Sequence, residues 1–231
     1  MNVQEATTRR LPDLKERHLP ENCRETINTI LKETYGYEQF RNLEIYDDLS
    51  KGKEKLCISQ GQLIENVILE AEKAWKSETQ VDNILLTAPT GSGKSLLFQL
   101  PAIYLGKEYN LLTIVVSPLK ALIVDQVESL QELGYARVAY ASSDLSPEQK
   151  MEVYRQVREG EIDLFYLSPE LLLSYDIKHF VGERRIGLVV VDEAHTVTTW
   201  GKEFRVDYWF LGRYLGALKQ NLGYSFPLFA L

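Results

Sequence analysis

An eight-residue run from Ala88 to Ser95 reads Ala-Pro-Thr-Gly-Ser-Gly-Lys-Ser, and its residue types and spacing suit phosphate binding. It matches the pattern Gly-x-x-x-x-Gly-Lys-Ser/Thr, except that Ala88 occupies the first glycine position. Gly91 and Gly93 allow the backbone to curl so that its amides point inward at phosphate oxygens. Lys94 would supply a mobile positive charge for the β- and γ-phosphates, and the Ser95 hydroxyl would be a ligand of Mg²⁺.

The alternative interpretation of this run is a glycine turn that merely caps a helix. An apolar stretch precedes the run and a helical pattern follows it. This context favours phosphate binding, because a helix N-terminus adds its partial positive charge at the same place. The predicted phosphate-binding residues are Thr90, Gly91, Ser92, Gly93, Lys94 and Ser95.

Two carboxylates, Asp192 and Glu193, follow a second apolar run over residues 188–191. Ligands of open parallel sheets bind at the carboxyl ends of the strands. We therefore expect Asp192 to hold Mg²⁺ together with Ser95, and Glu193 to orient and deprotonate an attacking water. His195 would couple this site to other elements or serve as a structural hydrogen-bonding group. An acidic turn that simply ends a core strand is the alternative, and the phosphate loop upstream favours catalysis. The expected catalytic residues are Lys94, Asp192 and Glu193.

Short apolar runs alternate with longer stretches of helical periodicity through most of the chain. The predicted strands are 83–88, 112–116, 138–140, 164–167, 187–191 and 227–231. The predicted helices are 62–75, 95–105, 119–133 and 146–159. Ser146 and Gln149 form a capping box, with Pro147 at the first helical position, so the start of the last helix is well marked. Buried strands separated by helices predict an α/β fold, with a mostly parallel sheet flanked by helices on both faces.

The N-terminal part of the chain is more polar than the rest. Residues 1–34 form an N-terminal extension with a weak helical pattern near residues 23–31, and residues 47–55 read as an exposed loop. We divide the chain into this extension, a segment over residues 35–62 that contains the loop, and an α/β domain over residues 63–231.

The composition is that of an ordinary globular protein, with 45% hydrophobic and 26% charged residues. There is no apolar run long enough for a membrane span and no secretory signal at the N-terminus, so an intracellular protein is expected. The two cysteines, Cys23 and Cys57, lack the spacing of a zinc site or a disulfide framework. The net charge of −7 predicts weak, salt-sensitive binding if nucleic acid is the partner.

Five segments in order resemble the RecQ family of superfamily 2 helicases, over roughly residues 33–231. They are Thr90-Gly-Ser-Gly-Lys-Ser-Leu-Leu-Phe-Gln-Leu-Pro-Ala102, Val116-Ser-Pro-Leu-Lys-Ala-Leu-Ile-Val-Asp-Gln126, Tyr166-Leu-Ser-Pro-Glu170, Asp192-Glu-Ala-His195 and Trp200-Gly-Lys-Glu-Phe-Arg-Val-Asp-Tyr208. The fourth is similar to a DEAH box, whereas the residues after it, Thr196-Val-Thr-Thr199, depart from the usual family wording. The resemblance implies a RecA-like ATP-binding domain that uses ATP and Mg²⁺, acts on DNA and works with a second RecA-like domain.

Residues that could contact nucleic acid lie in several of these segments. The Ser117-Pro118 and Ser168-Pro169 steps each end a strand and begin a helix, so that hydroxyls and free amides could take DNA phosphates, with Lys120 adding charge. Simple helix capping is the alternative. In the last segment, Trp200 and Phe204 could stack on unpaired bases or pack in the core, and Arg205 would sense the γ-phosphate or the acidic box. The predicted nucleic-acid or coupling residues are Ser117, Pro118, Lys120, Ser168, His195, Trp200, Phe204 and Arg205.

The segment Tyr35-Gly-Tyr-Glu-Gln-Phe-Arg41 resembles the adenine-reading motif of the same family. By that register Tyr37 would stack on adenine and Arg41 would cover its other face. The family has a glutamine three residues after the arginine, where this chain has Glu44. We favour Gln62 as a displaced adenine reader, with Gln60 as the next candidate. A glutamate in that role could not donate to the purine ring, which puts base selectivity in question.

The sequence therefore favours the ATP-binding motor domain of a RecQ-like DNA helicase. The fragment itself is expected to be a monomer that binds nucleotide but hardly hydrolyses it, because a second domain would supply an arginine finger. The alternative is a nucleotide-dependent DNA-binding or assembly module in a repair or defence complex, without strand separation. A GTPase is disfavoured because the guanine-reading Asn-Lys-x-Asp is not in the sequence.

Overall fold

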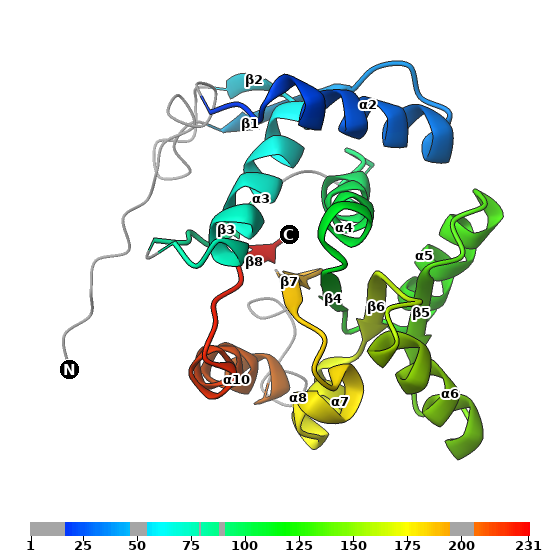
Figure 1. The fold of residues 1–231 in the computed structure, drawn as a ribbon. Coiled ribbons are helices and arrows are strands. Elements are labelled where there is room, and N and C mark those ends of the chain that lie inside the picture. The colour runs from blue at the N-terminus through cyan, green and yellow to red at the C-terminus, as the bar shows by residue number, and fades with distance from the viewer. Residues whose placement is uncertain (1–16, 47–54, 79, 88–90, 195–205) are drawn as a thin grey trace.

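A six-stranded sheet forms the centre of the computed structural model, which describes residues 17–46, 55–78, 80–87, 91–194 and 206–231 (Figure 1). The strand order is β3-β8-β7-β4-β6-β5, and every neighbouring pair is parallel. The strands are β3 (Ile84–Leu85), β4 (Leu112–Val116), β5 (Val138–Ala141), β6 (Leu164–Leu167), β7 (Ile186–Val191) and β8 (Leu228–Ala230). This architecture confirms the predicted α/β fold.

Helices cover both faces of the sheet (Figure 1). On one face lie α2 (Glu21–Tyr35), α3 (Gln60–Trp75), α4 (Leu96–Tyr109) and α5 (Lys120–Glu132). On the other lie α6 (Pro147–Arg158), α7 (Pro169–Ser174), α8 (Ile177–Val181) and α10 (Val206–Leu222). Successive strand residues point to opposite faces, so β6 sends Leu164 and Tyr166 into the first core and Phe165 and Leu167 into the second.

Most of the predicted elements are present with small shifts of their ends. The strands predicted at 112–116 and 164–167 have those bounds in the structure, whereas β3 is much shorter than the predicted 83–88. The capping box is confirmed, because the Ser146 hydroxyl accepts from the Gln149 amide and the Gln149 side chain accepts from the Ser146 amide. The short helices α7 and α8 and the long helix α10 were not predicted.

An antiparallel hairpin precedes α3 and was not predicted either. It consists of β1 (Asn42–Tyr46) and β2 (Lys55–Ser59), with Asn42 opposite Ser59. The loop predicted over residues 47–55 lies largely outside the described residues, and Lys55 belongs to β2. The helix α3 starts at Gln60, two residues before its predicted start, because the Ser59 hydroxyl caps it by accepting from the Gly61 amide.

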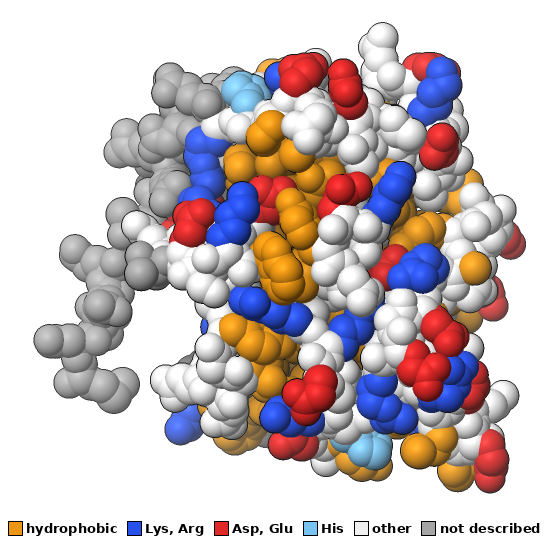
Figure 2. Space-filling view, in the orientation of Figure 1, with side chains coloured by type: hydrophobic (Ala, Val, Ile, Leu, Met, Phe, Trp, Pro, Cys, Tyr) orange, Lys and Arg blue, Asp and Glu red, His pale blue; other side chains and the backbone are white. Residues whose placement is uncertain are grey.

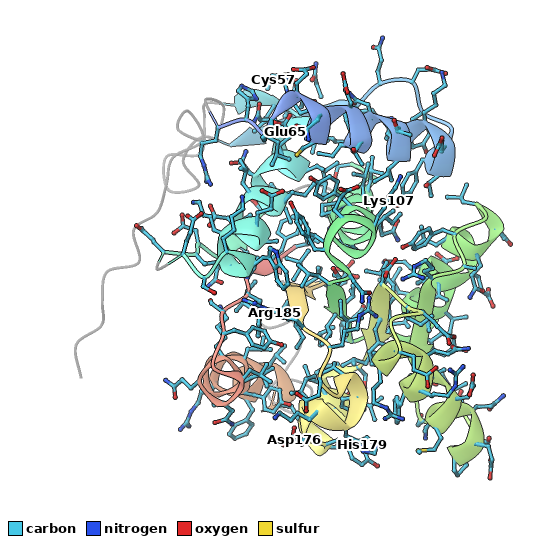
Figure 3. All side chains as sticks on the ribbon, in the orientation of Figure 1. Cys57, Glu65, Lys107, Asp176, His179 and Arg185 are labelled. Atoms are coloured by element: carbon cyan, nitrogen blue, oxygen red, sulfur yellow. The ribbon has the colours of Figure 1, made fainter. Side chains whose placement is uncertain are left out.

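An arginine joins the two helical layers near the start of β7. Arg185 lies between α3 and α10 in Figure 3, and its guanidinium group is 4.7 Å from the ring centre of Trp75 and 4.8 Å from that of Tyr224. It also donates to the carbonyl oxygen of Ala74 at 3.0 Å. Contact of a cation with two aromatic faces stabilises this edge of the molecule. Among the described residues, no helix is both long and apolar enough to cross a bilayer.

Candidate functional site

The predicted phosphate loop connects β3 to α4 at the carboxyl edge of the sheet. Its described part starts at Gly91, and Thr90 lies outside the described residues. Gly91 and Gly93 have φ angles of 81° and 75°, in the left-handed region that glycine tolerates. Ser95 directly precedes α4 at its N-cap position. The loop therefore has the curl that the sequence predicted, directly before the N-terminus of a helix of 14 residues.

Gln60 fixes this loop from one side. Its side chain is buried, with 2% exposure, and its Nε2 donates to the carbonyl oxygens of Ser92 at 3.1 Å and Gly93 at 3.5 Å. Its Oε1 accepts from the Arg41 amide at 3.1 Å. One side chain thus connects the predicted adenine-reading segment to the phosphate loop. A methyl group added at Gly93 would come within 2.7 Å of the Gln60 nitrogen.

Asp192 directly follows β7, at the same carboxyl edge of the sheet as the loop. Its side chain is buried, and Oδ2 accepts from the Ser117 hydroxyl at 3.4 Å and from Gln126 Nε2 at 3.5 Å. Its Oδ1 accepts from the Glu193 amide at 3.0 Å. Burial, followed by the charge of Glu193, raises the pKa of the Asp192 carboxyl, whereas the charge of Lys94 acts in the opposite direction. A positive charge at Lys94 thus favours the ionised form of Asp192.

Glu193 has a φ angle of 52°, a left-handed conformation that is uncommon for residues other than glycine. Such backbone strain concentrates at functional sites, because the surrounding structure must hold it in place. On either side of Glu193, the Asp192 amide donates to the Val116 carbonyl and the Ala194 amide donates to the Leu231 carbonyl. The strained residue is thus held between two ordered neighbours, directly after the metal-binding candidate.

The donor set at this edge fits a magnesium ion and a phosphate chain. Hard cations such as Mg²⁺ prefer carboxylate and hydroxyl oxygens, which Asp192 and Ser95 supply. The Ser92 hydroxyl is buried in the loop and has no hydrogen-bond partner among the described residues. A buried polar oxygen without a partner is costly, and a phosphate oxygen would satisfy it.

The adenine-reading candidates are only partly brought together. The Arg41 guanidinium group is 5.8 Å from the ring centre of Tyr37, whose side chain is 47% exposed. Gln60, the second candidate, contacts both Arg41 and the loop. Gln62, the favoured candidate, instead donates to the carbonyl oxygen of Arg17 at 2.8 Å, on the N-terminal side of α3. Glu44 lies on β1 opposite Cys57.

The residues predicted to contact nucleic acid have mixed positions. Ser117 does not start a helix as predicted, because α5 begins at Lys120 with Leu119 as its N-cap. Its hydroxyl is buried and donates to Asp192, while Pro118 is half-buried beside it. Lys120 is exposed and forms an ion pair with Asp144. Ser168 caps α7 by accepting from the Leu171 amide at 3.3 Å, which is the capping role given as the alternative for this step. The predicted residues His195, Trp200, Phe204 and Arg205 lie outside the described residues.

Several buried polar residues at the site were not predicted as functional. Gln99, Gln126 and Tyr166 form hydrogen bonds in the core on the phosphate-loop side of the sheet. The signal was present for Gln99 and Tyr166, since each is a polar residue within an apolar stretch of helix or strand, but not for Gln126, which directly follows Asp125. A polar side chain at such a position is buried, and a buried polar group needs a partner.

Comparisons with known proteins agree with this geometry. The family described as DEAD/DEAH box helicase matches residues 69–224. An ATP-dependent DNA helicase RecQ from Synechocystis sp. is 34% identical over 202 residues, which are 87% of this chain and 35% of that protein. RecQ from Haemophilus influenzae is 30% identical over 187 residues, or 81% of this chain and 25% of that protein. The chain therefore spans about a third or less of the length of these relatives.

Solved structures show the same fold. The DUF1998 helicase MrfA bound to DNA matches 93% of this chain and 25% of its own, with a TM-score of 0.57 and 21% sequence identity. The UvsW helicase from bacteriophage T4 matches 95% of this chain and 62% of its own, with a TM-score of 0.51 and 16% identity. A phosphate loop and an Asp-Glu pair at one edge of a parallel sheet, together with a family match over most of its length, show that this chain belongs to the DEAD/DEAH box helicases, with RecQ helicases among its relatives.

Proposed function

We propose that this chain is the ATP-binding motor domain of a RecQ-like DNA helicase, in which ATP hydrolysis drives movement along single-stranded DNA and duplex unwinding. The observation that supports this most directly is that the phosphate loop follows β3 and the acidic box follows β7 in one parallel sheet, so that both lie at its carboxyl edge. The relatives named above are ATP-dependent DNA helicases. Such an activity implies an intracellular location.

The phosphate loop would bind the triphosphate of ATP. The amides of Gly91 to Ser95 and the N-terminus of α4 point partial positive charge at the phosphates. Lys94 would neutralise the β- and γ-phosphates. The Ser92 hydroxyl, which has no partner among the described residues, would donate to a phosphate oxygen. The Thr90 backbone would complete the loop.

Ser95 and Asp192 would hold Mg²⁺, which neutralises charge on the phosphates when it is bound. Glu193 would accept the proton of the attacking water. Its left-handed backbone turns its side chain away from the path of β7, and its amide bonds to Asp192. The two neighbouring carboxylates would therefore have different roles, Asp192 as a metal ligand and Glu193 as the general base for the water.

The base of ATP would stack on the Tyr37 ring, and Arg41 would cover the other face of the base. We propose Gln60 rather than Gln62 as the residue that links base recognition to the phosphates, because Gln60 contacts both Arg41 and the loop. Gln62 contacts the N-terminal segment instead. The role that the sequence assigned to a displaced glutamine thus fits Gln60 better.

DNA would bind at the same edge of the sheet, along the ends of β4, β5 and β6. Lys120, at the start of α5, is an exposed cation, and its partner Asp144 would have to yield to a DNA phosphate. Ser168 would offer the free amides of its helix. We propose that Trp200, Phe204, Arg205 and His195 connect DNA binding to the acidic box, as the family resemblance implies. Ser117 would act indirectly, since its hydroxyl is committed to Asp192.

The test is the ATPase activity of the protein at its natural full length, measured with and without single-stranded DNA. We expect Mg²⁺-dependent hydrolysis that DNA stimulates, and a Trp200→Ala variant should keep the basal rate while losing most of the stimulation. A protein that binds nucleotide but shows no stimulation by DNA would instead be an assembly module. A protein that binds no nucleotide would contradict the whole proposal.

A further inference from the structure

A row of hydrogen bonds runs through the core on the phosphate-loop side of the sheet. Gln126 Nε2 donates to Asp192 Oδ2 at 3.5 Å, and Gln126 Oε1 accepts from the Tyr166 hydroxyl at 3.0 Å. The same hydroxyl accepts from Gln99 Nε2 at 3.2 Å, and Gln99 Oε1 accepts from the Tyr35 hydroxyl at 3.3 Å. The row therefore extends from the end of α2, through α4, β6 and α5, to the carboxylate that follows β7.

The direction of these bonds is set by the carboxylate at their end. An ionised carboxylate can only accept, so Gln126 must present its amide nitrogen to Asp192 and its oxygen to Tyr166. The Tyr166 hydroxyl must then donate to Gln126, and Gln99 must present its nitrogen to Tyr166. Gln99 is left with its oxygen for the Tyr35 hydroxyl. Every donor in the row thus points toward Asp192, an arrangement in which each bond polarises and strengthens the next.

The row is well shielded from water. Tyr166 is fully buried, Gln99 and Gln126 are 6% and 8% exposed, and Asp192 is 4% exposed. Tyr166 lies against Phe98 in the same core, with ring centres 6.4 Å apart. Apolar side chains would fill this space at lower cost, because each buried amide depends on its partners. The energetic cost of keeping polar groups here points to a role beyond packing.

The far end of the row touches the predicted base platform. The rings of Tyr35 and Tyr37 are stacked, with centres 6.4 Å apart and an angle of 17° between their planes. Arg41 covers the Tyr37 ring. A base bound at Tyr37 would therefore be next to Tyr35, the first residue of the row. The metal would bind at Asp192, the last residue.

We propose that Tyr35, Gln99, Tyr166 and Gln126 are positioning residues that hold Asp192 in the orientation for metal binding and couple it to occupation of the base platform. The inference rests on the nucleotide site proposed above. It assigns these side chains no contact with substrate; they act through Asp192 alone. Loss of one link should therefore weaken metal-dependent binding and leave metal-free nucleotide binding nearly unchanged.

The main test variant is Tyr166→Phe, which removes one oxygen atom and two hydrogen bonds of the row. The control is Tyr154→Phe, the same change at a buried tyrosine on the opposite face of the sheet, against Phe165. In the full-length protein, binding of a fluorescent, non-hydrolysable ATP analogue is titrated with Mg²⁺ and repeated in EDTA, and Tm is recorded.

For Tyr166→Phe we expect the Mg²⁺ concentration at half-maximal binding to rise about tenfold, as for other groups that orient metal ligands. Affinity in EDTA should change less than about twofold. Tyr154→Phe should leave both values unchanged even if its Tm falls. If Tyr166→Phe does not fold, Gln126→Met provides the same test, since it removes the donor to Asp192 and leaves the other three side chains intact.

Transmission along the row is tested with a second variant, Tyr35→Phe, and with the double variant. Tyr35→Phe should raise the Mg²⁺ midpoint about threefold on its own, within the usual range of coupling between sites. Added to Tyr166→Phe it should change nothing further, because the connection is already cut. If the two residues acted independently, the fold-changes of the Mg²⁺ midpoint in the two single variants would multiply in the double variant.

An unchanged Mg²⁺ midpoint in Tyr166→Phe, or multiplying effects in the double variant, would overturn the relay. Failure of the wild-type protein to bind the analogue with Mg²⁺ would overturn the proposed function as well. The two failures are therefore distinguishable.

Discussion

The residues Asp192 and Glu193 show how two adjacent carboxylates acquire different roles. Asp192 is buried and accepts hydrogen bonds from Ser117, Gln126 and the Glu193 amide. Glu193 is less buried and has a left-handed backbone. Its hydrogen bonds fix the first carboxylate in an orientation that would suit a metal ligand, and the second would accept the proton of a water molecule as a general base.

Replacing Glu193 with glutamine should separate binding from hydrolysis. The substitution keeps the size of the side chain but removes the proton acceptor, so the rate of ATP hydrolysis should fall by roughly 10²- to 10⁴-fold. Affinity for ATP should stay within about twofold, because Lys94 and the loop amides are unaffected. Steady-state ATPase assays and equilibrium nucleotide binding measure the two quantities. Hydrolysis at the wild-type rate would remove Glu193 from the mechanism.

The two loop glycines offer a matched pair of substitutions. Among the described residues beyond its chain neighbours, alanine at Gly91 would meet no atom within 4 Å, whereas alanine at Gly93 would approach the Gln60 nitrogen to 2.7 Å. Both positions have positive φ, so both variants carry a backbone penalty of about 1 kcal/mol. Gly93→Ala should also displace Gln60 and lose at least about tenfold more ATP affinity than Gly91→Ala, since it disturbs a buried hydrogen bond. Equal losses in calorimetric titrations would show that Gln60 does not support the loop.

The identity of the linking glutamine could not be read from the sequence, and the reason is geometric. Arg41 and Gln60 are 19 residues apart, yet Gln60 Oε1 accepts from the Arg41 amide, and the Gln60 amide donates to the Arg41 carbonyl. The β1–β2 hairpin folds the chain back on itself between them. A motif register counts residues along the chain, so it cannot predict that a hairpin brings Gln60 back beside Arg41. Lys94, Ser95 and Asp192 were predicted because each directly adjoins the element that positions it.

At the scale of elements, α3 connects the N-terminal segment to the phosphate loop. Its first residue, Gln60, contacts the loop, and Glu70 farther along binds Arg17 at 2.6 Å and Lys73 at 3.0 Å. Glu70 also accepts from the Asp82 amide at 2.8 Å. Burial alone would raise the pKa of Glu70, but the hydrogen bonds from Asp82, Arg17 and Lys73 lower it overall. The helix thus joins residues before and after it through one buried carboxylate.

This lowered pKa predicts a loss of stability in acid. A carboxyl with a lower pKa in the folded state contributes stability above its unfolded value of 4.5, and that contribution disappears as the pH falls through the folded pKa. At pH 7, Glu70→Gln should lower the free energy of unfolding by about 1–3 kcal/mol. The difference from wild type should shrink below pH 4.5.

Chemical denaturation of both proteins across this pH range measures the effect. Glu33→Gln on α2 is the control, since Glu33 is exposed, and its substitution should change the free energy of unfolding little at any pH. A difference for Glu70→Gln that does not depend on pH would show that the carboxylate charge is not what stabilises this junction.

Elements were predictable where the signal was local. The start of α6 followed from its capping box, and β4 and β6 from apolar runs of strand length. The β1–β2 hairpin was missed although Leu43 and Ile58 are its buried residues, because polar neighbours on both strands resemble a loop. The short helices α7 and α8 have 6 and 5 residues, too few to show a helical period.

At the scale of the whole molecule, the surface charge is mixed. Figure 2 shows acidic and basic side chains interspersed over the face it displays, without a continuous basic patch. The net charge is −7. The proposed DNA-binding edge would therefore depend on few cations, Lys120 among them, and on backbone amides. The number of these cations determines how strongly the affinity for DNA should depend on salt concentration.

Binding of single-stranded DNA should therefore be weak and should weaken further as salt is added. We expect a slope of log K against log salt concentration between about −1.5 and −3, corresponding to about two to four neutralised phosphates. A Lys120→Ala variant should reduce the slope by about 0.7, the contribution of one phosphate contact. Fluorescence anisotropy with a labelled oligonucleotide at several salt concentrations measures it, and Lys107→Ala on α4 serves as a control. A slope that Lys120→Ala leaves unchanged would place the DNA elsewhere.

The position of β3 in the sheet bears on how the protein is made. In the described part of the chain, the strand that leads into the phosphate loop is paired with β8 alone, and the Leu228 amide bonds to the Asn83 side chain across 145 residues of sequence. During synthesis on the ribosome, β4 to β7 can assemble before β8, the pairing partner of β3, has been made. Closing so long a loop is entropically costly, so the pairing forms late. A nascent chain should thus acquire its sheet before it acquires the capacity to hold a nucleotide.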